Sequence, residues 1–167
     1  MKKQFSTLAF GLIFITSLTF SQNKNIWFNA NWQKTTKDKA TFYRKPPQKK
    51  GKGYWFQDFY ISGKIQMEGL SLKKDIEFYD GLVIWYYENG TIFQKVNYFN
   101  GYLYGKRLIY YKNGKLKQSL FYKRGRKNKQ GKEFYPDGRL KAQGNYHDDK
   151  KVGVWKHFYY DGVDFED

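Results

Sequence analysis

A glycine that recurs every 24 residues is the feature of this sequence that most limits its fold. Three of the four steps between successive glycines are 24 residues long, and the first is 27. An aromatic pair ends three positions before each glycine, and Ser, Asn or Asp directly precedes it. A fixed period with matching columns is typical of an array of small repeated units, each stacked on its neighbours. The repeat glycines are Gly63, Gly90, Gly114, Gly138 and Gly162.

The residues around these glycines predict β-hairpins. Asn-Gly and Asp-Gly supply the two positive φ angles of a two-residue type I′ turn, and aromatic pairs suit the strands beside it. In one unit, strands at 85–87 and 92–98 would flank a turn at Asn89-Gly90, and 99–105 would form a looser return turn. Successive hairpins would then pair as a meander. The predicted fold is all-β, a single elongated antiparallel sheet of tandem hairpins with about ten strands.

Composition and side-chain alternation agree with a single sheet. Aromatic residues make up 22% of the 167-residue chain, which favours strands and argues against disorder. One face should bury aliphatic and aromatic side chains, and the other should be solvated and basic. The alternation is clearest where Leu116, Gln118 and Leu120 interleave with Lys115, Lys117 and Ser119.

Two units depart from the pattern. A second glycine column runs through Gly81, Gly105 and Gly153, but Lys129 stands where the column predicts glycine. The first unit has three extra residues, around 73–80. We expect irregular structure at these two places, because the turn chemistry that the other units share is interrupted there.

Residues 1–21 have the pattern of a signal peptide. Lys2 and Lys3 precede a largely apolar stretch from Leu8 to Phe20, and small residues lie just before Gln22. The alternative is a membrane anchor, but the apolar stretch is shorter than the ~20 residues that a bilayer span needs. We therefore expect export to the periplasm or to the cell surface and extracellular space, and a mature chain from Gln22 without a transmembrane segment.

The remaining boundaries follow from composition. Residues 22–53 are predicted to form an N-terminal cap and linker, in which 41–44 begins the sheet, Trp27 and Trp32 cover its exposed end, and 46–53 is a turn or linker. The repeat array is predicted over 54–163, and residues 164–167 form an acidic tail.

The repeated motifs resemble those of the MORN-repeat family, particularly its bacterial variant. The motifs are Tyr-Tyr-Glu-Asn-Gly at 86–90, Tyr-Tyr-Lys-Asn-Gly at 110–114, Phe-Tyr-Pro-Asp-Gly at 134–138 and Phe-Tyr-Tyr-Asp-Gly at 158–162. The resemblance implies a scaffold of repeats that contacts phospholipids or partner proteins, with no catalytic set and no cofactor. The bacterial variant is often labelled a YwqK-type antitoxin. The signal peptide argues against a cytoplasmic antitoxin and leaves an exported, immunity-like role as an alternative.

The residues that could carry chemistry do not cluster in the sequence. The chain has no Cys, which excludes disulfides and thiolate catalysis. Its two histidines, His147 and His157, are ten residues apart, whereas a metal pair usually needs closer spacing or more ligands. Asp148-Asp149 falls in a predicted turn, where solvated charge is the expected role. We expect no enzyme activity, no cofactor and no metal site.

The basic surface is the main functional signal. The net charge is +16, and cations gather around the third return turn. Cations among tyrosines suit anionic lipid or glycan surfaces, and export makes nucleic acid an unlikely natural partner. The alternative is that a thin aromatic sheet needs charge for solubility. The candidate anion-binding residues are Arg107, Lys123, Arg124, Arg126, Lys127 and Lys129.

The function that the sequence favours is therefore an exported, non-enzymatic scaffold for protein–protein interaction, whose partner protein the sequence does not identify. The alternatives are peripheral binding to anionic lipid or glycan surfaces, and an antitoxin or immunity-like role.

Overall fold

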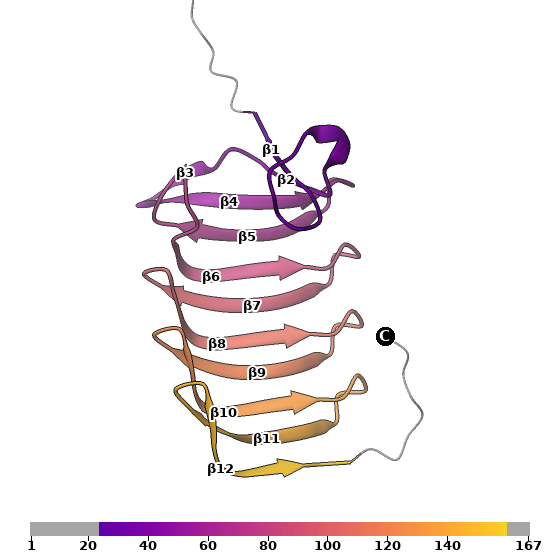
Figure 1. Ribbon diagram of the computed structural model, residues 1–167, viewed down its shortest axis with the longest axis vertical. Helices are drawn as coiled ribbons and strands as arrows, with labels where there is room; N and C mark the ends of the chain where they lie inside the picture. The colour runs from indigo at the N-terminus through magenta and orange to yellow at the C-terminus, as the bar shows by residue number, and fades with distance from the viewer. Residues whose placement is uncertain (1–23, 160–167) are drawn as a thin grey trace, which may run out of the picture.

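The computed structural model describes residues 24–159, which form a 12-stranded antiparallel sheet and contain no α-helix (Figure 1). The predicted all-β hairpin meander is confirmed, with two strands more than expected. Sheet order follows chain order, except that β3 pairs only with β4, beside β2. The strands are β1 (Ile26–Phe28), β2 (Phe42–Arg44), β3 (Gln48–Lys50), β4 (Gly53–Tyr60), β5 (Ile65–Ser71), β6 (Tyr79–Tyr86), β7 (Ile92–Phe99), β8 (Tyr102–Tyr110), β9 (Leu116–Lys123), β10 (Arg126–Phe134), β11 (Leu140–His147) and β12 (Lys150–His157), with one 3-10 turn, η1 (Lys37–Lys39).

The N-terminal part of the sheet is larger than the sequence predicts. The strand expected at 41–44 is β2, but β1 pairs outside it, so the sheet begins one strand earlier. The segment 46–53, predicted as a turn or linker, contains β3, which pairs with the first half of β4. Trp32 stacks on Phe42, with ring centroids 4.5 Å apart. This stacking covers part of the end of the sheet where β1 and β2 lie.

The Asn-Gly and Asp-Gly hairpin turns differ from the predicted type I′ turn. Only the glycine of each pair has a positive φ, such as +88° at Gly90. The Gly90 amide donates to the Tyr87 carbonyl (2.9 Å), and the Tyr87 amide donates to the Thr91 carbonyl (2.8 Å), which leaves a three-residue loop. Asn89 contributes its side chain instead, because its Oδ1 accepts from the Thr91 amide at 3.0 Å. The prediction was wrong because Asn-Gly fits both the two-residue turn and the loop that ends in a left-handed glycine.

Two-residue type I′ turns occur instead at the return turns, which the sequence predicts to be loose. Strand pairing closes directly around them, for example from Phe99 to Tyr102. Both central residues have positive φ, as this turn type requires. The three turns are Asn100-Gly101 (+47° and +79°), Arg124-Gly125 (+50° and +80°) and Asp148-Asp149 (+46° and +70°).

Two kinds of hydrogen bond join each hairpin to the next, beside the pairing of their strands: one from tyrosine hydroxyls and one from backbone amides of the return turns. The tyrosine at the second position of each aromatic pair donates its hydroxyl to the carbonyl of the first residue of the following pair. An example is the bond from Tyr111 to Phe134 (2.7 Å). Each return turn also donates a backbone amide to the previous unit, as from Gly125 to Leu103 (2.9 Å). The other hydroxyl bonds run from Tyr60 to Tyr86, Tyr87 to Tyr110 and Tyr135 to Phe158.

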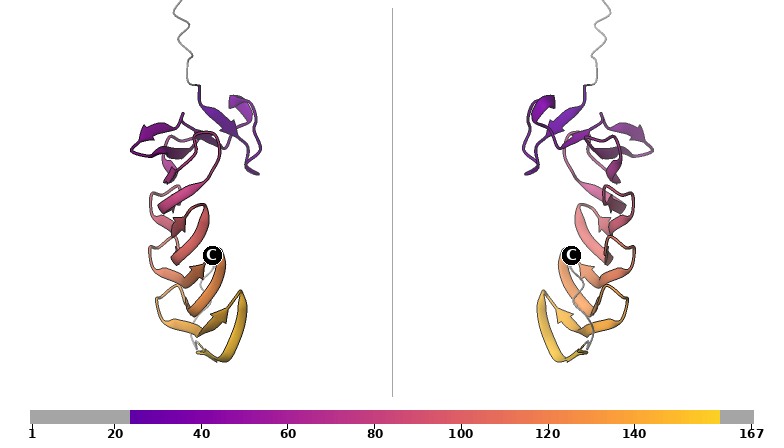
Figure 2. Two further views of the ribbon diagram at one scale, coloured as in Figure 1. Left: turned by 90° about the vertical axis from the view of Figure 1, so that its left-hand side faces the viewer. Right: turned by 90° about the vertical axis from the view of Figure 1, so that its right-hand side faces the viewer.

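One sheet face, here called the packed face, holds the buried side chains, and the opposite one is called the outer face. Val83 and Val96 are fully or almost fully buried on the packed face. Glycine makes room at some positions, because a Cβ on Gly69 would lie 2.7 Å from Val83 Cγ2. The side views in Figure 2 show the hairpins stacked along one axis, with β1 at one end and β12 at the other. The core is therefore a narrow strip that runs the length of the array.

Irregular structure occurs where the sequence predicts it. Residues 72–78 form a loop between β5 and β6. Ser71 organises this loop, since its Oγ accepts from two loop amides and its single hydroxyl proton is shared between two loop carbonyls. Lys129 adopts a φ of +61°, close to the +65° of Gly153 in the same column. A lysine here takes a backbone conformation that suits glycine, at a cost of about 1 kcal/mol.

Candidate functional site

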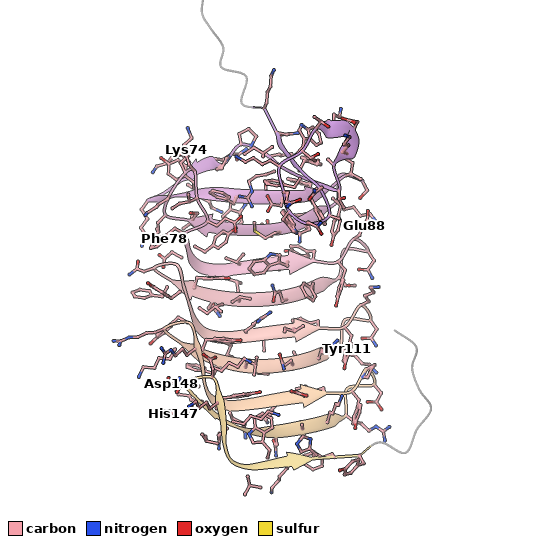
Figure 3. The ribbon with its side chains drawn as sticks, in the orientation of Figure 1. Lys74, Phe78, Glu88, Tyr111, His147 and Asp148 are labelled. Carbon is pink, nitrogen blue, oxygen red and sulfur yellow. The ribbon has the colours of Figure 1, made fainter. Side chains whose placement is uncertain are left out.

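The return turns and the strand ends beside them bring equivalent side chains of successive units together along one edge. This edge lies at the left of Figure 1, and His147 and Asp148 mark it in Figure 3. Because the units are 24 residues long, equivalent positions recur at that interval on the same face. Three columns of outer-face or turn positions result: Phe99, Lys123 and His147; Asn100, Arg124 and Asp148; and Tyr102, Arg126 and Lys150.

Exposed aromatic rings form the first part of this edge. Phe99, Tyr102 and Tyr104 are 59%, 64% and 49% exposed, although Phe is usually buried and Tyr is usually at least partly buried. Phe99 and Tyr104 contact each other with ring centroids 6.0 Å apart. Together with Asn100, Lys123 and Arg124, they line a hollow of about 770 Å³. These aromatics are not among the site residues that the sequence predicts, because what distinguishes them is their place at a return turn on the outer face of the folded array.

A second hollow follows in the next unit. It measures about 490 Å³ and shares Lys123 and Arg124 with the first. These two cations therefore form a common wall between the two hollows. The other lining residues of the second hollow are Arg126, Asn128, His147 and Asp148.

The cations of this edge differ in how far they are neutralised. Arg126 Nη1 lies 3.9 Å from Asp148 Oδ2, and both groups are more than half exposed. Lys123 and Arg124 form no ion pair within residues 24–159. Their charges are therefore available to a ligand. We call Phe99, Tyr102, Tyr104, Lys123 and Arg124 the return-turn patch.

Three of the six predicted anion-binding residues do not belong to this cluster. Arg107 lies on the packed face, where its Nε and Nη2 both donate to Gln94 Oε1, at 3.1 and 2.9 Å. Lys127 also faces the packed side, and its ammonium is 5.4 Å from the centre of the Tyr146 ring. Lys129 reaches the outer face away from the two hollows, where its Nζ lies 4.5 Å from the centre of the Phe121 ring. Lys123, Arg124 and Arg126 are the three that the structure brings together.

Several other lysines lie over aromatic rings. Lys50 Nζ is 3.9 Å from the Trp55 ring centre, and Lys45 Nζ is 4.2 Å from that of Phe59. Such cation–π contacts contribute about 0.5–1 kcal/mol at exposed sites, and the lysine stems cover apolar surface. Part of the large positive charge therefore comes from lysines that cover aromatic surface of the thin sheet. In this role these lysines differ from Lys123 and Arg124.

A third hollow, of about 510 Å³, lies near the N-terminal end on the packed face. Its polar centre is Arg44, which donates to Asp58 Oδ1 and Oδ2 at 2.6 and 2.7 Å and to Glu77 Oε1 at 2.6 Å. Burial lowers the pKa of the Arg44 guanidinium, but hydrogen bonds and charge from Asp58 and Glu77 more than offset this, so its pKa stays raised. This network joins β2, β4 and the 72–78 loop, and its groups are already satisfied by one another.

The fold places the two histidines at opposite edges of the sheet. His147 ends β11 at the return-turn edge, and His157 ends β12 at the opposite edge. Asp148 and Asp149 follow His147 in the return turn between β11 and β12, where Asp149 Oδ1 accepts from the Lys127 amide at 2.9 Å. Within residues 24–159, no three His, Asp or Glu side chains gather as metal ligands would. The same residues contain no helix long and apolar enough to cross a bilayer.

The predicted repeat glycines lie at the opposite edge. Gly63, Gly90, Gly114 and Gly138 occupy the hairpin loops there, all with positive φ, near Glu88 and Tyr111 in Figure 3. Gly162, the predicted signal peptide at 1–21 and the predicted acidic tail at 164–167 lie outside the described residues. The glycines shape the array and are remote from the return-turn patch.

Comparison with known proteins identifies the repeated unit. The family model of the MORN repeat variant matches residues 79–100, 103–124 and 127–148. Each match covers one hairpin and ends on the first residue of a return turn, at Asn100, Arg124 or Asp148. No curated protein matches the chain. MORN repeats generally serve interactions with proteins or membranes. Three tandem units between residues 79 and 148 are therefore similar to the MORN repeat variant.

Proposed function

We propose that this protein is an exported, non-enzymatic scaffold that binds a partner protein through the return-turn patch. The single observation that carries the proposal is the hollow of about 770 Å³ where exposed aromatic rings meet Lys123 and Arg124. Interaction sites commonly combine aromatic anchors with a few charged groups at their rim. Tyrosine and arginine are among the residues that contribute most to such sites.

The backbone at Arg124 supports a binding role for its side chain. Arg124 has a φ of +50°, at the turn position that Asn100 and Asp148 occupy in the neighbouring units. Asn and Asp tolerate the left-handed region better than other side chains, so Arg costs stability there. A strained residue that also lines two hollows fits a site where stability is given up for binding.

The substitution Arg124→Asn gives a sharp test, because Asn suits the turn and should keep or raise stability. The purified protein would be used as bait for cell-envelope proteins. We expect a partner that is retained by the wild type and lost with the Lys123→Gln, Arg124→Asn variant. The matched control is Lys112→Asn, an exposed cation at the hairpin-loop edge. Identical capture by the wild type and the double variant would refute the patch as the binding site.

Export is a separate part of the proposal. It is supported by the charged start and the apolar stretch within residues 1–21. Mass spectrometry of the N-terminal peptide from cells that express the full chain tests it. A mature N-terminus at Gln22, with the protein outside the cytoplasm, is the expected result. An intact Met1 on a cytoplasmic protein would contradict export.

Binding to an anionic lipid or glycan surface is the second candidate, and the pairing of exposed tyrosines with cations favours it. Such rings sit well at a membrane interface, and each Lys or Arg near an anionic surface contributes about 1 kcal/mol. Flotation with phosphatidylserine and phosphatidylcholine vesicles, at low and high salt, separates this candidate from the first. Salt-sensitive flotation with phosphatidylserine alone, abolished by Lys123→Gln, Arg124→Asn, would favour the membrane.

A further inference from the structure

The repeat geometry fixes the distance between the aromatic and basic parts of the return-turn patch. Each unit contributes two strands, and neighbouring strands are about 4.8 Å apart, so equivalent residues of successive units lie about 10 Å apart. Tyr102 and Tyr104 lie on β8, and Lys123 lies on the neighbouring strand β9, beside Tyr104 and one position beyond the Gly105–Tyr122 pair. The step from the two tyrosines to Lys123 and Arg124 is therefore one to one and a half strand spacings, or about 5–7 Å.

An extended peptide rises about 3.3 Å per residue and its side chains alternate between two sides, so side chains two residues apart point the same way and lie about 6.6 Å apart. We infer that the outer face at the return turns binds an extended acidic segment of a partner protein, in which an apolar side chain and a carboxylate are two residues apart. The segment runs along the long axis of the array, across the strand ends. The apolar side chain enters the hollow beside Tyr102 and Tyr104, and the carboxylate binds Lys123 and Arg124.

Charge selects the position of the carboxylate. Among the three cations that line the two hollows, Lys123 and Arg124 form no ion pair within the described chain, and they lie at the shared wall, about one strand beyond Tyr102 and Tyr104. One repeat beyond Arg124, Asp148 lines the second hollow and repels a second carboxylate there. The two hollows together cover two repeat steps, or about 20 Å, which corresponds to about six extended residues. An acidic group at the middle of such a segment matches the charges best.

This inference rests on the proposed function and adds the chemistry of the partner. A protein segment is favoured over a membrane because the apolar and anionic subsites lie at a fixed spacing along the array. A lipid surface presents anionic groups at variable positions and needs no such spacing. Recognition by spacing is typical of extended peptides, whose side chains meet successive pockets.

Peptides of equal composition test the spacing. In Ac-Gly-Ser-Phe-Ser-Glu-Gly-Ser-Gly-NH2 the Phe and Glu are two residues apart, and in Ac-Gly-Ser-Ser-Gly-Phe-Glu-Ser-Gly-NH2 they are adjacent. Each is titrated into the purified protein labelled with ¹⁵N, and chemical shifts are followed by NMR. We expect the spaced peptide to bind about tenfold more tightly, the worth of one added charge-assisted contact, with shifts confined to the return turns around Tyr102 and Arg124.

Variants separate the two halves of the site. Arg124→Asn should remove the preference for the spaced peptide, and replacing Glu by Gln in that peptide should have the same effect. Tyr102→Ser should weaken both peptides, while Lys112→Asn should change neither. Equal binding of the spaced and adjacent peptides, or an unchanged preference in Arg124→Asn, would overturn the inference.

The outcomes also distinguish this inference from the proposed function. If partner capture depends on Lys123 and Arg124 but the peptides bind equally, the spacing is wrong and the scaffold function stands. If phosphatidylserine vesicles bind and the spaced peptide does not, the surface is a membrane site and the inference fails. If neither the peptides nor a partner depends on the patch, both proposals fail.

Discussion

The tyrosine ladder between hairpins should be a main source of cohesion along the array. Tyr60, Tyr87 and Tyr111 donate to carbonyls of the following unit at 2.8, 2.9 and 2.7 Å, and all three bonds are partly buried. The perturbation is Tyr→Phe at these three positions, alone and together. It removes one oxygen from each ring and leaves the aromatic packing in place.

The expected loss follows from the bonds themselves. A hydrogen bond of this kind contributes about 0.5–1.5 kcal/mol net, so each substitution should cost about 1 kcal/mol. The three sites lie in different units, about one repeat step apart, so their effects should nearly add to about 3 kcal/mol. This is a large part of the roughly 5–15 kcal/mol that stabilises a typical domain.

Urea unfolding followed by tyrosine and tryptophan fluorescence measures these losses. The matched control is Tyr104→Phe, whose ring is 49% exposed and whose hydroxyl forms no hydrogen bond within residues 24–159. The control should change the free energy of unfolding by less than about 0.5 kcal/mol, as exposed substitutions usually do. A triple variant as stable as the control would refute the ladder as a source of stability.

Three further predictions concern backbone, packing and pH. Gly105→Ala should cost about 1 kcal/mol in unfolding free energy from backbone strain alone, because φ is +85° and no atom lies closer than 3.8 Å to the added Cβ. Gly69→Ala should cost about 1–3 kcal/mol through overpacking, because its Cβ would lie 2.7 Å from a methyl group of the fully buried Val83. Burial and the hydrogen bond to Glu68 raise the pKa of Tyr86 to about 12 from 10.0, so its contribution to stability should be complete below pH 10 and lost as pH rises to 12. Urea unfolding checks the two glycine variants, and a series from pH 9 to 12 compares the wild type with Tyr86→Phe.

Each of these predictions has an outcome that contradicts it. Combining Gly69→Ala with Val83→Ala should recover part of the loss if overpacking is the cause, and no recovery would show another cause. For Gly105, substitution by Asn should cost less than Ala, since Asn tolerates positive φ. If Tyr86→Phe loses stability with pH as steeply as the wild type between pH 10 and 12, the assignment to Tyr86 is wrong.

The sequence predicts the fold well where one residue type has one structural meaning. The glycine period and the aromatic pairs gave the hairpin array, since few other arrangements satisfy a 24-residue repeat of this kind. The sequence predicts type I′ turns at the Asn-Gly and Asp-Gly pairs, but the structure has them at the return turns. Asn-Gly suits both a two-residue turn and a three-residue loop, and the strand register decides which of the two forms. Arg124-Gly125 and Asp148-Asp149 did not look like tight turns, yet both adopt the type I′ φ angles.

The candidate site was predicted only in part, for a geometric reason. The basic run 123–129 is contiguous in sequence, but alternation along β10 sends Lys127 to the packed face while Arg126 stays on the outer one. The aromatic half of the patch lies one unit earlier, at Phe99, Tyr102 and Tyr104. Only the columns of the folded array bring these residues beside Lys123. Ligand-binding surfaces of repeat proteins have to be sought in such columns and not in runs along the chain.

The strands of the array pack substantially only against their neighbours in the sheet, and this has a mechanical consequence. A force that pulls the two ends apart along the stacking axis loads the strand pairs one after another, as in a zipper. Each hairpin that peels away would release 24 residues, or about 80 Å of extended chain. The hydrogen bonds that the tyrosine hydroxyls and the return-turn amides make between hairpins would contribute to the force needed to detach each hairpin. The protein should therefore lengthen under load in regular increments, and the hairpins that remain folded should keep their turns and surface columns.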